Sequence, residues 1–322
     1  MNARVQDIPA ATALTEDSIN APGNGSFSVR IDATAGFSAD RISPIRHNLH
    51  EHPLLQLPRL AKLAHDLMST KQCRFIQPES TQTSAFLHLS KTPNERSIDD
   101  VFEHIEETGS WVALYDIQTD PEYQALLNEL IDSARRHFEA EHPGLFHVAG
   151  FIFISAPPSV TPFHIDRENN FWMQLRGRKV ITVFDHKDRE VVLAPAVEDF
   201  IVHGSLRGVR LKEELRSHGH DFDVGPGEGV YFPSTSPHMT ETHTDWVRPG
   251  DGVSISLGAV FYTSITRRHA RAHQCNRIMR RLGMNPAFPG QSAWRDTLKA
   301  GIGWAVGKTR AKFRGYKLPV GH

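Results

Sequence analysis

Short runs of β-branched and aromatic residues follow one another between about residues 145 and 265, and this succession limits the available folds more than any other feature. Turn residues separate the runs, and Gly177 between two arginines is typical of a tight hairpin. Short, evenly spaced strands favour an antiparallel sandwich or barrel. The runs cover residues 148–154, 170–175, 179–184, 230–232 and 253–261.

Helical patterns lie on both sides of these runs. Apolar residues recur at helical spacing from Leu54 to Met68, and Ser97 with Asp100 resembles a capping box that opens a helix towards residue 108. Pro121 opens a further amphipathic helix. The pattern predicts a mainly β fold with flanking helices. The expected parts are a flexible N-terminal arm (1–40), a helical region bracing the barrel (41–144), the barrel (145–265) and a basic helical C-terminal region (266–322).

The composition excludes several classes of protein. The formal net charge is -1, so no global charge marks a nucleic-acid-binding or membrane-binding protein. Cys73 and Cys275 lie far apart in the sequence, which argues against a disulfide framework and a thiolate zinc site. We find no apolar run of signal-peptide length at the N-terminus and no stretch near the roughly 20 apolar residues of a membrane span. We therefore expect a cytoplasmic location.

A histidine followed two residues later by an acid can chelate one metal ion from a strand, because residues i and i+2 project to the same side. The 19 histidines supply five such pairs, which begin at His104, His137, His164, His186 and His243. The first two fall in predicted helices, where such side chains diverge, and the fourth falls in a charged turn. The pairs that begin at His164 and His243 remain as candidates.

The pair of His164 and Asp166 has the stronger context. A proline-containing approach leads into it, and the clearest hairpin of the sequence follows it. A later predicted strand, 229–233, leads to His238, which can return a third ligand from across the barrel. Two histidines and one carboxylate on one face leave coordination positions open, and this is the facial triad of non-haem iron(II) oxygenases. His243 is the competing distal ligand.

Two blocks of sequence carry a resemblance to a known family. Residues 160–179 read VTPFHIDRENNFWMQLRGRK, and residues 229–238 read GVYFPSTSPH. They resemble the JmjC/cupin-like 2-oxoglutarate oxygenases, in particular the asparaginyl hydroxylase that modifies hypoxia-inducible factor. The resemblance covers roughly residues 148–261. It implies a double-stranded β-helix, a cupin or jelly-roll barrel, with a helical N-terminal half and C-terminal helices.

The resemblance also implies roles for the matching residues and an activity. The implied iron(II) ligands and catalytic residues are His164, Asp166 and His238. Lys179 would pair with the distal carboxylate of the cosubstrate 2-oxoglutarate, Thr161 would donate a hydrogen bond to it, and Asn170 would help to orient it. The implied activity is hydroxylation, with O2 as the oxidant, of an unidentified protein side chain or small molecule.

Charge and strand parity agree with the role of Lys179. A dicarboxylate inside a barrel needs a buried cation, because an unpaired buried charge is very unfavourable. Arg176 and Arg178 are rival cations. Hairpin parity places Arg178 on the opposite face from Lys179, so we prefer the lysine.

The last predicted core strand, 253–261, alternates large apolar residues with Ser254, Ser256 and Gly258. This small face would suit a cavity wall, or alternatively a solvated face. The asparaginyl hydroxylase has an asparagine near the position of Gly258 and aromatic residues just before the distal histidine. These departures concern the substrate side more than the iron ligands.

The C-terminal region is strongly basic. From Arg267 onwards it holds 13 Lys or Arg against one acid, Asp296. Trp294, Leu298 and Ile302 interleave with these charges at near-helical spacing. The region could bind nucleic acid, an anionic membrane or an acidic partner. We favour a helix that packs its apolar stripe on the barrel or on a twin subunit, and the resemblance implies a homodimer through C-terminal helices.

Two alternatives to the oxygenase remain. A non-catalytic cupin-like regulator would bind a metal or ligand and use the basic C-terminal region to bind a partner. A cupin isomerase or metal-dependent lyase would use the metal without 2-oxoglutarate. A pure binding module has no need of an open iron site, and the match at Thr161 and Lys179 argues against the isomerase.

Overall fold

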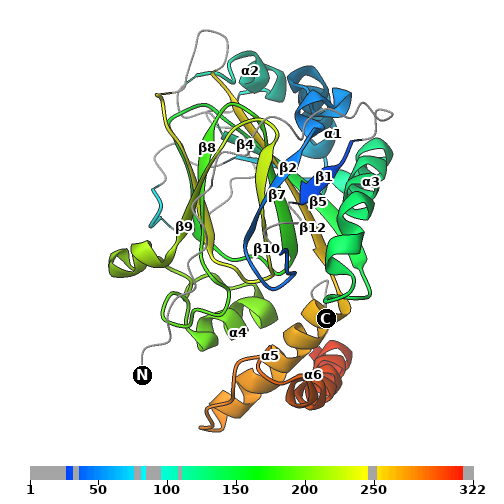
Figure 1. Cartoon of the computed structure of the whole chain (residues 1–322), viewed down its shortest axis with the longest axis vertical. Coiled ribbons are helices and arrows are strands. Elements are labelled where there is room, and N and C mark those ends of the chain that lie inside the picture. Colours follow the sequence, from blue (N-terminus) through cyan, green and yellow to red (C-terminus); the bar gives the residue numbers. More distant parts are fainter. Residues whose placement is uncertain are drawn as a thin grey trace.

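The computed structural model describes residues 27–31, 36–75, 81–84, 96–107, 111–245 and 252–314. Most of the predicted N-terminal arm (1–40) lies outside these residues. Figure 1 shows two β-sheets that face each other, with helices along the outer side of one sheet and a second group of helices at one end.

The two sheets are antiparallel throughout their described pairings. The larger sheet has eight strands in the order β1-β2-β10-β7-β12-β5-β4-β3, and the smaller has four in the order β6-β11-β8-β9. The strand bounds are β1 Val29–Ile31, β2 Ser43–His47, β3 Cys73–Phe75, β4 Trp111–Leu114, β5 Phe146–Ser155, β6 Ser159–His164, β7 Asn169–Arg176, β8 Lys179–Val183, β9 His220–Val224, β10 Glu228–Phe232, β11 His238–Thr242 and β12 Ser254–Tyr262.

Strands β5 to β12 form the barrel. Consecutive strands change sheet at every step except from β8 to β9, which pair within the smaller sheet. The pairings are nested, since β5 pairs with β12, β6 with β11 and β7 with β10. Nested pairing between two facing sheets defines the jelly roll, or double-stranded β-helix. The structure therefore confirms the fold class predicted from the sequence.

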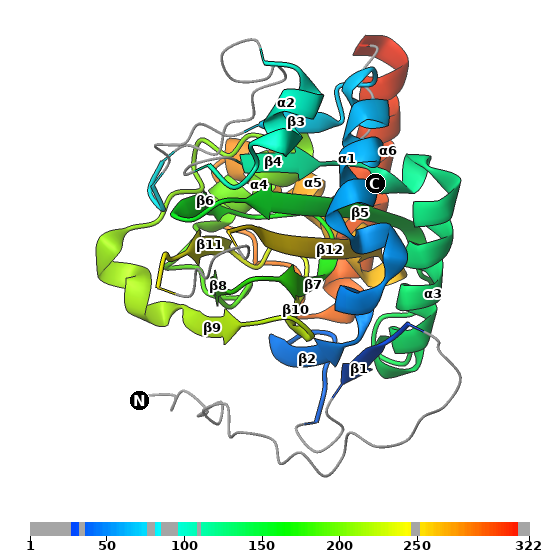
Figure 2. The same cartoon turned by 90° about the horizontal axis from the view of Figure 1, so that it is seen from above.

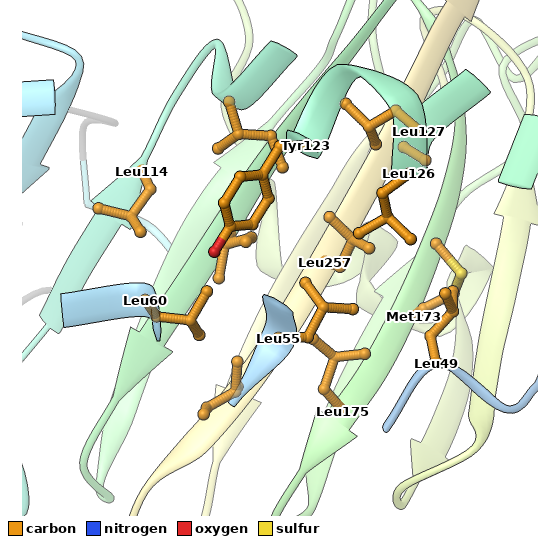
Figure 3. Packing of buried hydrophobic residues seen from close by; sticks show 14 of the residues in the cluster. Leu49, Leu55, Leu60, Leu114, Tyr123, Leu126, Leu127, Met173, Leu175 and Leu257 are labelled. Carbon is orange, nitrogen blue, oxygen red and sulfur yellow. The ribbon is translucent and has the colours of Figure 1, made fainter. Parts of the chain in front are cut away.

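The main hydrophobic core lies outside the barrel, between the larger sheet and helices α1 (Leu57–Met68) and α3 (Pro121–Phe138). Figure 3 shows Leu60 of α1 and Tyr123 of α3 meeting side chains of the sheet such as Leu257. These three side chains are at most 1% exposed. Because the helices bury the outer face of the sheet, the inner face remains available for a cavity.

Side-chain caps fix where α2 and α3 begin. Asp120 accepts hydrogen bonds from the backbone N–H groups of Glu122 and Tyr123 at the start of α3. Ser97 accepts from the N–H of Asp100 at the start of α2 (Ile98–Glu103), as predicted. Helix α2 ends at Glu103, earlier than the sequence pattern suggested.

The region expected to be helical, 41–144, also supplies strands β2, β3 and β4. Figure 2 shows that these strands extend the larger sheet at both edges. They have three to five residues each, too few for an alternating pattern to be recognised in the sequence. These segments become strands because they form hydrogen bonds to neighbouring strands of the larger sheet.

The described part of the segment 1–40, residues 27–31 and 36–40, packs against the barrel and α3. Strand β1 pairs with β2, and the N–H of Val29 donates to Ser133 Oγ of α3 at 3.1 Å. Val29 is 4% exposed and Ala39 is fully buried. Isolated apolar residues in a polar stretch gave no periodic signal of this docking.

Helices α4 (Ala194–His203), α5 (Ser264–Arg281) and α6 (Ala293–Arg314) gather at one end of the barrel (Figure 1). Arg280 of α5 binds the carboxylate of Glu198 of α4, with Nε 3.0 Å from Oε1, and Glu198 is 1% exposed. This ion pair joins α5 to the barrel through α4. Within the described residues, we find no helix with the length and apolar character that crossing a membrane requires.

Helix α6 packs on α5 through small residues. Ala300, Gly303 and Gly307 face inward, and a Cβ added at Gly303 would overlap the carbonyl oxygen of Arg271. The apolar stripe of Trp294, Leu298 and Ile302 lies exposed on α6, at 67%, 62% and 50%. The expected packing of this stripe on the barrel is therefore wrong, because the small residues, and not the large ones, allow the close approach of the two helices.

Candidate metal centre and its cavity

The three predicted ligands meet at one end of the smaller sheet. His164 is the last residue of β6 and His238 is the first of β11, and the two lie opposite each other in the strand pairing. Their ring centroids are 4.1 Å apart. Asp166 follows β6, with its Oδ2 3.5 Å from His238 Nε2. One ligand atom from each of the three residues lies within 4.8 Å of the other two.

Backbone carbonyls orient both imidazoles in the same way. His164 Nδ1 donates to the carbonyl of Pro162 at 2.7 Å, and His238 Nδ1 donates to that of Ser236 at 3.0 Å. A carbonyl can only accept, so each bond places the proton on Nδ1. The lone pair is then on Nε2, which is how outer carbonyls orient metal-binding histidines.

Burial keeps His238 in its neutral form. The ring is 4% exposed, and burial, aided by the neighbouring His164, lowers the pKa of His238 to about 4 even though Asp166 acts in the opposite direction. A neutral imidazole is the form that binds a metal ion. His238 can therefore accept a divalent ion at neutral pH without first losing a proton.

The donor set fits iron(II). Two imidazole nitrogens and one carboxylate oxygen are the facial arrangement that leaves open positions on non-haem iron. The two carbonyl hydrogen bonds are the outer support that such histidines need. The roles of His164, Asp166 and His238 as metal ligands stay a prediction at this point.

The rival pairs do not share this arrangement. The side chain of His243 is 51% exposed, and its Nδ1 lies 3.7 Å from Glu241 Oε1. A second group of ligand types, Asp100, Glu103 and His104, lies on the surface of α2. Its histidine is bonded to the helix itself, through the carbonyl of Asp100. Exposed groups of this kind are ordinary solvated helix surface.

A cavity of about 300 Å³ inside the barrel joins the three predicted ligands to Lys179 and Thr161. Thr161 of β6 lies opposite Thr240 of β11, and both line the cavity. Thr161 is 5% exposed. The structure thus places two of the three residues predicted to bind the cosubstrate in the same cavity as the candidate ligands.

Lys179, the first residue of β8, is a buried cation without an acidic partner among the described residues. It is 2% exposed, and its Nζ lies 3.4 Å from the hydroxyl of Ser155. Burial lowers the pKa of Lys179 to about 7. An anion that entered the cavity would supply the missing partner.

The rival cation Arg178 points to the outside of the barrel. Its Nε donates to Asp223 Oδ1 of β9 at 2.7 Å, and its side chain is 58% exposed. The parity argument from the hairpin is therefore correct for Arg178 and Lys179.

Asn170 does not line the cavity. It is fully buried in β7, and neither atom of its side-chain amide has a hydrogen-bond partner in the described part of the chain. It lies two residues before Trp172, which does line the cavity. Residues two apart on a strand share a face, so Asn170 lies on the inner side of the barrel next to that indole.

Much of the cavity wall was not predicted from the sequence. Trp172 and Thr240 could have been found by parity, because each lies two residues from a predicted site residue on the same strand. Tyr115 could not, because it follows the short strand β4. Burial, with a smaller effect of Asp166, raises the pKa of the Tyr115 hydroxyl. The remaining wall residues are Phe151, Phe153, Ile165, Phe200 and Leu206.

The small face of β12 points into the barrel but does not line the cavity. Ser254 and Ser256 each form a 2.9 Å hydrogen bond with the side chain of Gln174. A Cβ added at Gly258 would overlap the ring of Phe151. Gln174 and Phe151 thus fill the space that these small residues leave, and the expectation that they form a cavity wall is wrong.

No protein-family model and no curated protein matches the chain. Solved structures that resemble it include those of the ribosomal oxygenase YcfD from Escherichia coli. The complex of that protein with cobalt and 2-oxoglutarate has a TM-score of 0.48 and 16% sequence identity, covering 89% of this chain and 69% of the other. A further structure of E. coli YcfD has a TM-score of 0.46 and 15% identity, covering 88% and 68%. A cupin superfamily protein from Desulfitobacterium hafniense has a TM-score of 0.22 and 13% identity, covering 36% and 67%.

Proposed function

We propose that this protein is an iron(II)- and 2-oxoglutarate-dependent oxygenase that hydroxylates a protein side chain or a small molecule. One observation carries the proposal: two kinds of group line the same cavity inside the barrel. The first is a set of two imidazoles and one carboxylate, and the second is the ammonium of Lys179, which has no acidic partner among the described residues. A metal-binding module needs no such cation. A dicarboxylate cosubstrate does.

His164, Asp166 and His238 would hold the iron, and the carbonyls of Pro162 and Ser236 would keep the two rings in place. Three protein ligands leave coordination positions for the cosubstrate and oxygen. Iron(II), when bound, would supply the chemistry in which 2-oxoglutarate and O2 yield succinate and carbon dioxide, and the second oxygen atom enters a C–H bond of the substrate as a hydroxyl group.

The protein would contribute three things to the cosubstrate site: a positive charge, an oriented hydrogen bond and an apolar wall that excludes water. The ammonium of Lys179 would bind the distal carboxylate, and the hydroxyl of Thr161 would donate a hydrogen bond to it. The aromatic wall of the cavity would exclude water. Asn170 shares the inner face of β7 with Trp172, so it would act on the cosubstrate through the position of that indole.

Succinate formation tests the proposal. Wild-type protein with iron(II), O2 and 2-oxoglutarate should form succinate in the presence of a substrate found by screening peptide and metabolite pools. The His164→Ala and Asp166→Ala variants should form none, whereas His243→Ala should keep full turnover, because its side chain lies outside the cavity. Undiminished turnover in either of the first two variants would remove the assignment of that residue.

The same experiment separates the oxygenase from the non-catalytic regulator. A regulator would bind iron(II) without turnover of 2-oxoglutarate under any condition. A regulator that binds only a metal ion would also bring no counter-charge for the buried ammonium of Lys179.

We also propose that the protein forms a homodimer through helix α6. Trp294, Leu298 and Ile302 form an uncharged, exposed stripe along α6, opposite the face that packs on α5. In a twofold dimer the same stripe of each chain meets its copy, so both are buried at once. An exposed apolar surface of this kind is typical of interaction sites.

A further inference from the structure

A second cavity lies outside the candidate metal centre, between the end of the barrel and helix α5. It has a volume of about 180 Å³. Its wall comes from the segments that follow β6, β8 and β10, from α5 and from the start of α6. None of the three candidate metal ligands, nor Lys179, lines it, so it is a separate site.

Two buried side chains on this wall have polar atoms without a partner among the described residues. Asn169 is fully buried; its Oδ1 accepts from the N–H of Ser234 at 3.0 Å, whereas its Nδ2 has no partner within the described ranges. His142 is 5% exposed; its Nε2 bonds Asp40 at 3.0 Å, and its Nδ1 has no partner there either. Buried polar atoms are nearly always bonded, so both atoms need an explanation. Because Nε2 of His142 donates to the Asp40 carboxylate, Nδ1 of a neutral ring is an acceptor, and of the two only Asn169 Nδ2 is a donor that an anion could bind.

Three cations line the same cavity. Arg167, Lys187 and Arg268 form no ion pair with any acid that the structure describes. The Nε atoms of both arginines are buried and have no hydrogen-bond partner among the described residues. Arg167 Nη2 donates to the carbonyl of Phe200 at 2.9 Å, which holds its guanidinium in place. Both guanidinium groups therefore carry positive charge that no described acid pairs with directly.

The acids of the cavity are already engaged. Asp40, Glu141 and Asp296 line it, and each accepts a hydrogen bond from the protein. The bond from His142 holds the pKa of Asp40 well below its usual value. The donors to the three acids are His142 Nε2 at 3.0 Å, the N–H of Ala39 at 2.9 Å and the N–H of Gly290 at 2.8 Å. Each acid thus has a donor from the protein, whereas Asn169 Nδ2 and the Nε atoms of Arg167 and Arg268 are donors without a described acceptor.

We propose that this second cavity binds a small oxyanion, a phosphate or a carboxylate, through Asn169, Arg167 and Arg268. Guanidinium groups match the planar oxygen pairs of such anions. The volume of the cavity admits only a small molecule.

The wall of the second cavity continues into the loop that carries a candidate metal ligand. The hydroxyl of Ser234 donates to the carbonyl of Arg167 at 2.7 Å, and the N–H of Thr235 donates to the carbonyl of Asp166 at 2.9 Å. An oxyanion bound to Arg167 would therefore stabilise two segments: the one after β6, which carries Asp166, and the one after β10, which is hydrogen-bonded to it.

The test is calorimetric titration of inorganic phosphate, and separately of succinate, into the Lys179→Met variant. This variant lacks the cation of the first cavity, so binding there does not interfere. We expect one binding site. Adding Arg268→Gln should weaken binding by about tenfold or more, because a charge-assisted hydrogen bond is lost. Arg281→Gln, at the exposed end of the same helix, is the matched control and should leave the affinity unchanged.

Lys187→Gln is the second variant if Arg268→Gln fails to fold, because Lys187 is an exposed cation that also lines the cavity and would add to the attraction of the anion; affinity equal to that of the parent would then overturn the proposal. It should also weaken binding. Tighter binding of phosphate than of succinate would identify a phosphate ligand, and the reverse a carboxylate. The proposal is overturned if neither anion binds saturably, or if the Arg268→Gln and Arg281→Gln variants bind equally well. Either outcome is independent of 2-oxoglutarate turnover.

Discussion

Among single residues, Lys179 is expected to destabilise the folded protein while it serves the proposed function. A cation that is 2% exposed and has only a distant hydroxyl for a partner among the described residues disfavours folding. The same burial lowers the pKa of the lysine to about 7, because it disfavours the charged form. Such a group is understandable where a ligand brings the opposite charge.

Replacing this lysine should separate stability from binding. We expect Lys179→Met to melt a few degrees higher than the wild type at pH 7, since a buried unpaired charge is replaced by an apolar chain of similar size. The gap should widen as the pH falls from 10.5 to 7, because in this window the unfolded lysine keeps a proton that the folded one has lost, so lowering the pH destabilises the wild type and not the variant. In other words, raising the pH towards 10.5 should bring the two melting temperatures together. Scanning calorimetry at several pH values measures both effects.

The same variant should bind 2-oxoglutarate more weakly by about 30-fold or more, as expected when one partner of a buried charge pair is removed. Titration of 2-oxoglutarate into metal-loaded protein under anaerobic conditions measures this loss. Lys212→Met, on the exposed surface, is the control and should bind normally. Unchanged affinity in Lys179→Met would show that the cosubstrate lies elsewhere.

The affinity of the wild type for 2-oxoglutarate should depend on pH. Only the protonated lysine pairs with a carboxylate, and its pKa in the free protein is about 7. Above pH 7 binding therefore requires proton uptake, and the affinity should fall by up to about tenfold per pH unit. Titrations from pH 6 to 9 test this, and an affinity that is constant over the range would contradict it.

The sequence was most informative for residues whose role follows from spacing along a strand. His164 and Asp166 are two apart, and Lys179 and Arg178 are neighbours on opposite faces, so parity separates them. Tyr115 had no such signal, because its place in the cavity wall depends on the pairing of β4 with β5. A cavity wall is a property of tertiary packing.

Among the elements, the contact between α5 and α6 depends on close approach of two backbones. Gly303 lies against the carbonyl of Arg271, whereas a Cβ added at Gly301 on the same helix would have no neighbour within 4 Å among the described residues. Gly303 therefore packs closely against α5, whereas Gly301 of the same helix has free space beside it.

Alanine at these two positions should have opposite effects. We expect Gly303→Ala to destabilise the docking of α6 by about 1–3 kcal/mol, because the added methyl group forces the helices apart. Gly301→Ala should stabilise the helix by up to about 1 kcal/mol, since alanine has the higher helix propensity. Denaturant unfolding and limited proteolysis of α6 measure both. Equal effects of the two substitutions would mean that the helices are not in contact at Gly303.

Long elements were predictable from the sequence and short ones were not. The apolar spacing of α1 and the proline and aspartate at the start of α3 specify those helices locally. Strands β2 to β4 carry too few residues for a pattern, so their pairing in the sheet determines them. Periodicity also predicted the apolar stripe of α6, but it could not tell whether the stripe meets the barrel or a second subunit.

In the whole molecule, two faces of α6 have different neighbours: one packs on α5, and the other exposes Trp294, Leu298 and Ile302. If that stripe is the dimer interface, a charge placed in it should produce monomers.

We expect the wild type to elute as a dimer in size-exclusion chromatography with light scattering, and Leu298→Asp to elute as a monomer, because two buried carboxylates would face the same interface. Thr297→Asp adds the same charge beside the stripe and should remain dimeric. A wild-type monomer would leave the stripe for a different partner, for which salt-dependent binding to anionic liposomes or to DNA is the assay.

Anaerobic titration of iron(II) into four proteins tests the central claim, the convergence of three side chains on one ion, most directly. We predict one iron per chain for the wild type and for His243→Ala, and no stoichiometric binding for His164→Ala and His238→Ala. Loss of iron in His243→Ala together with retention in His238→Ala would contradict the account.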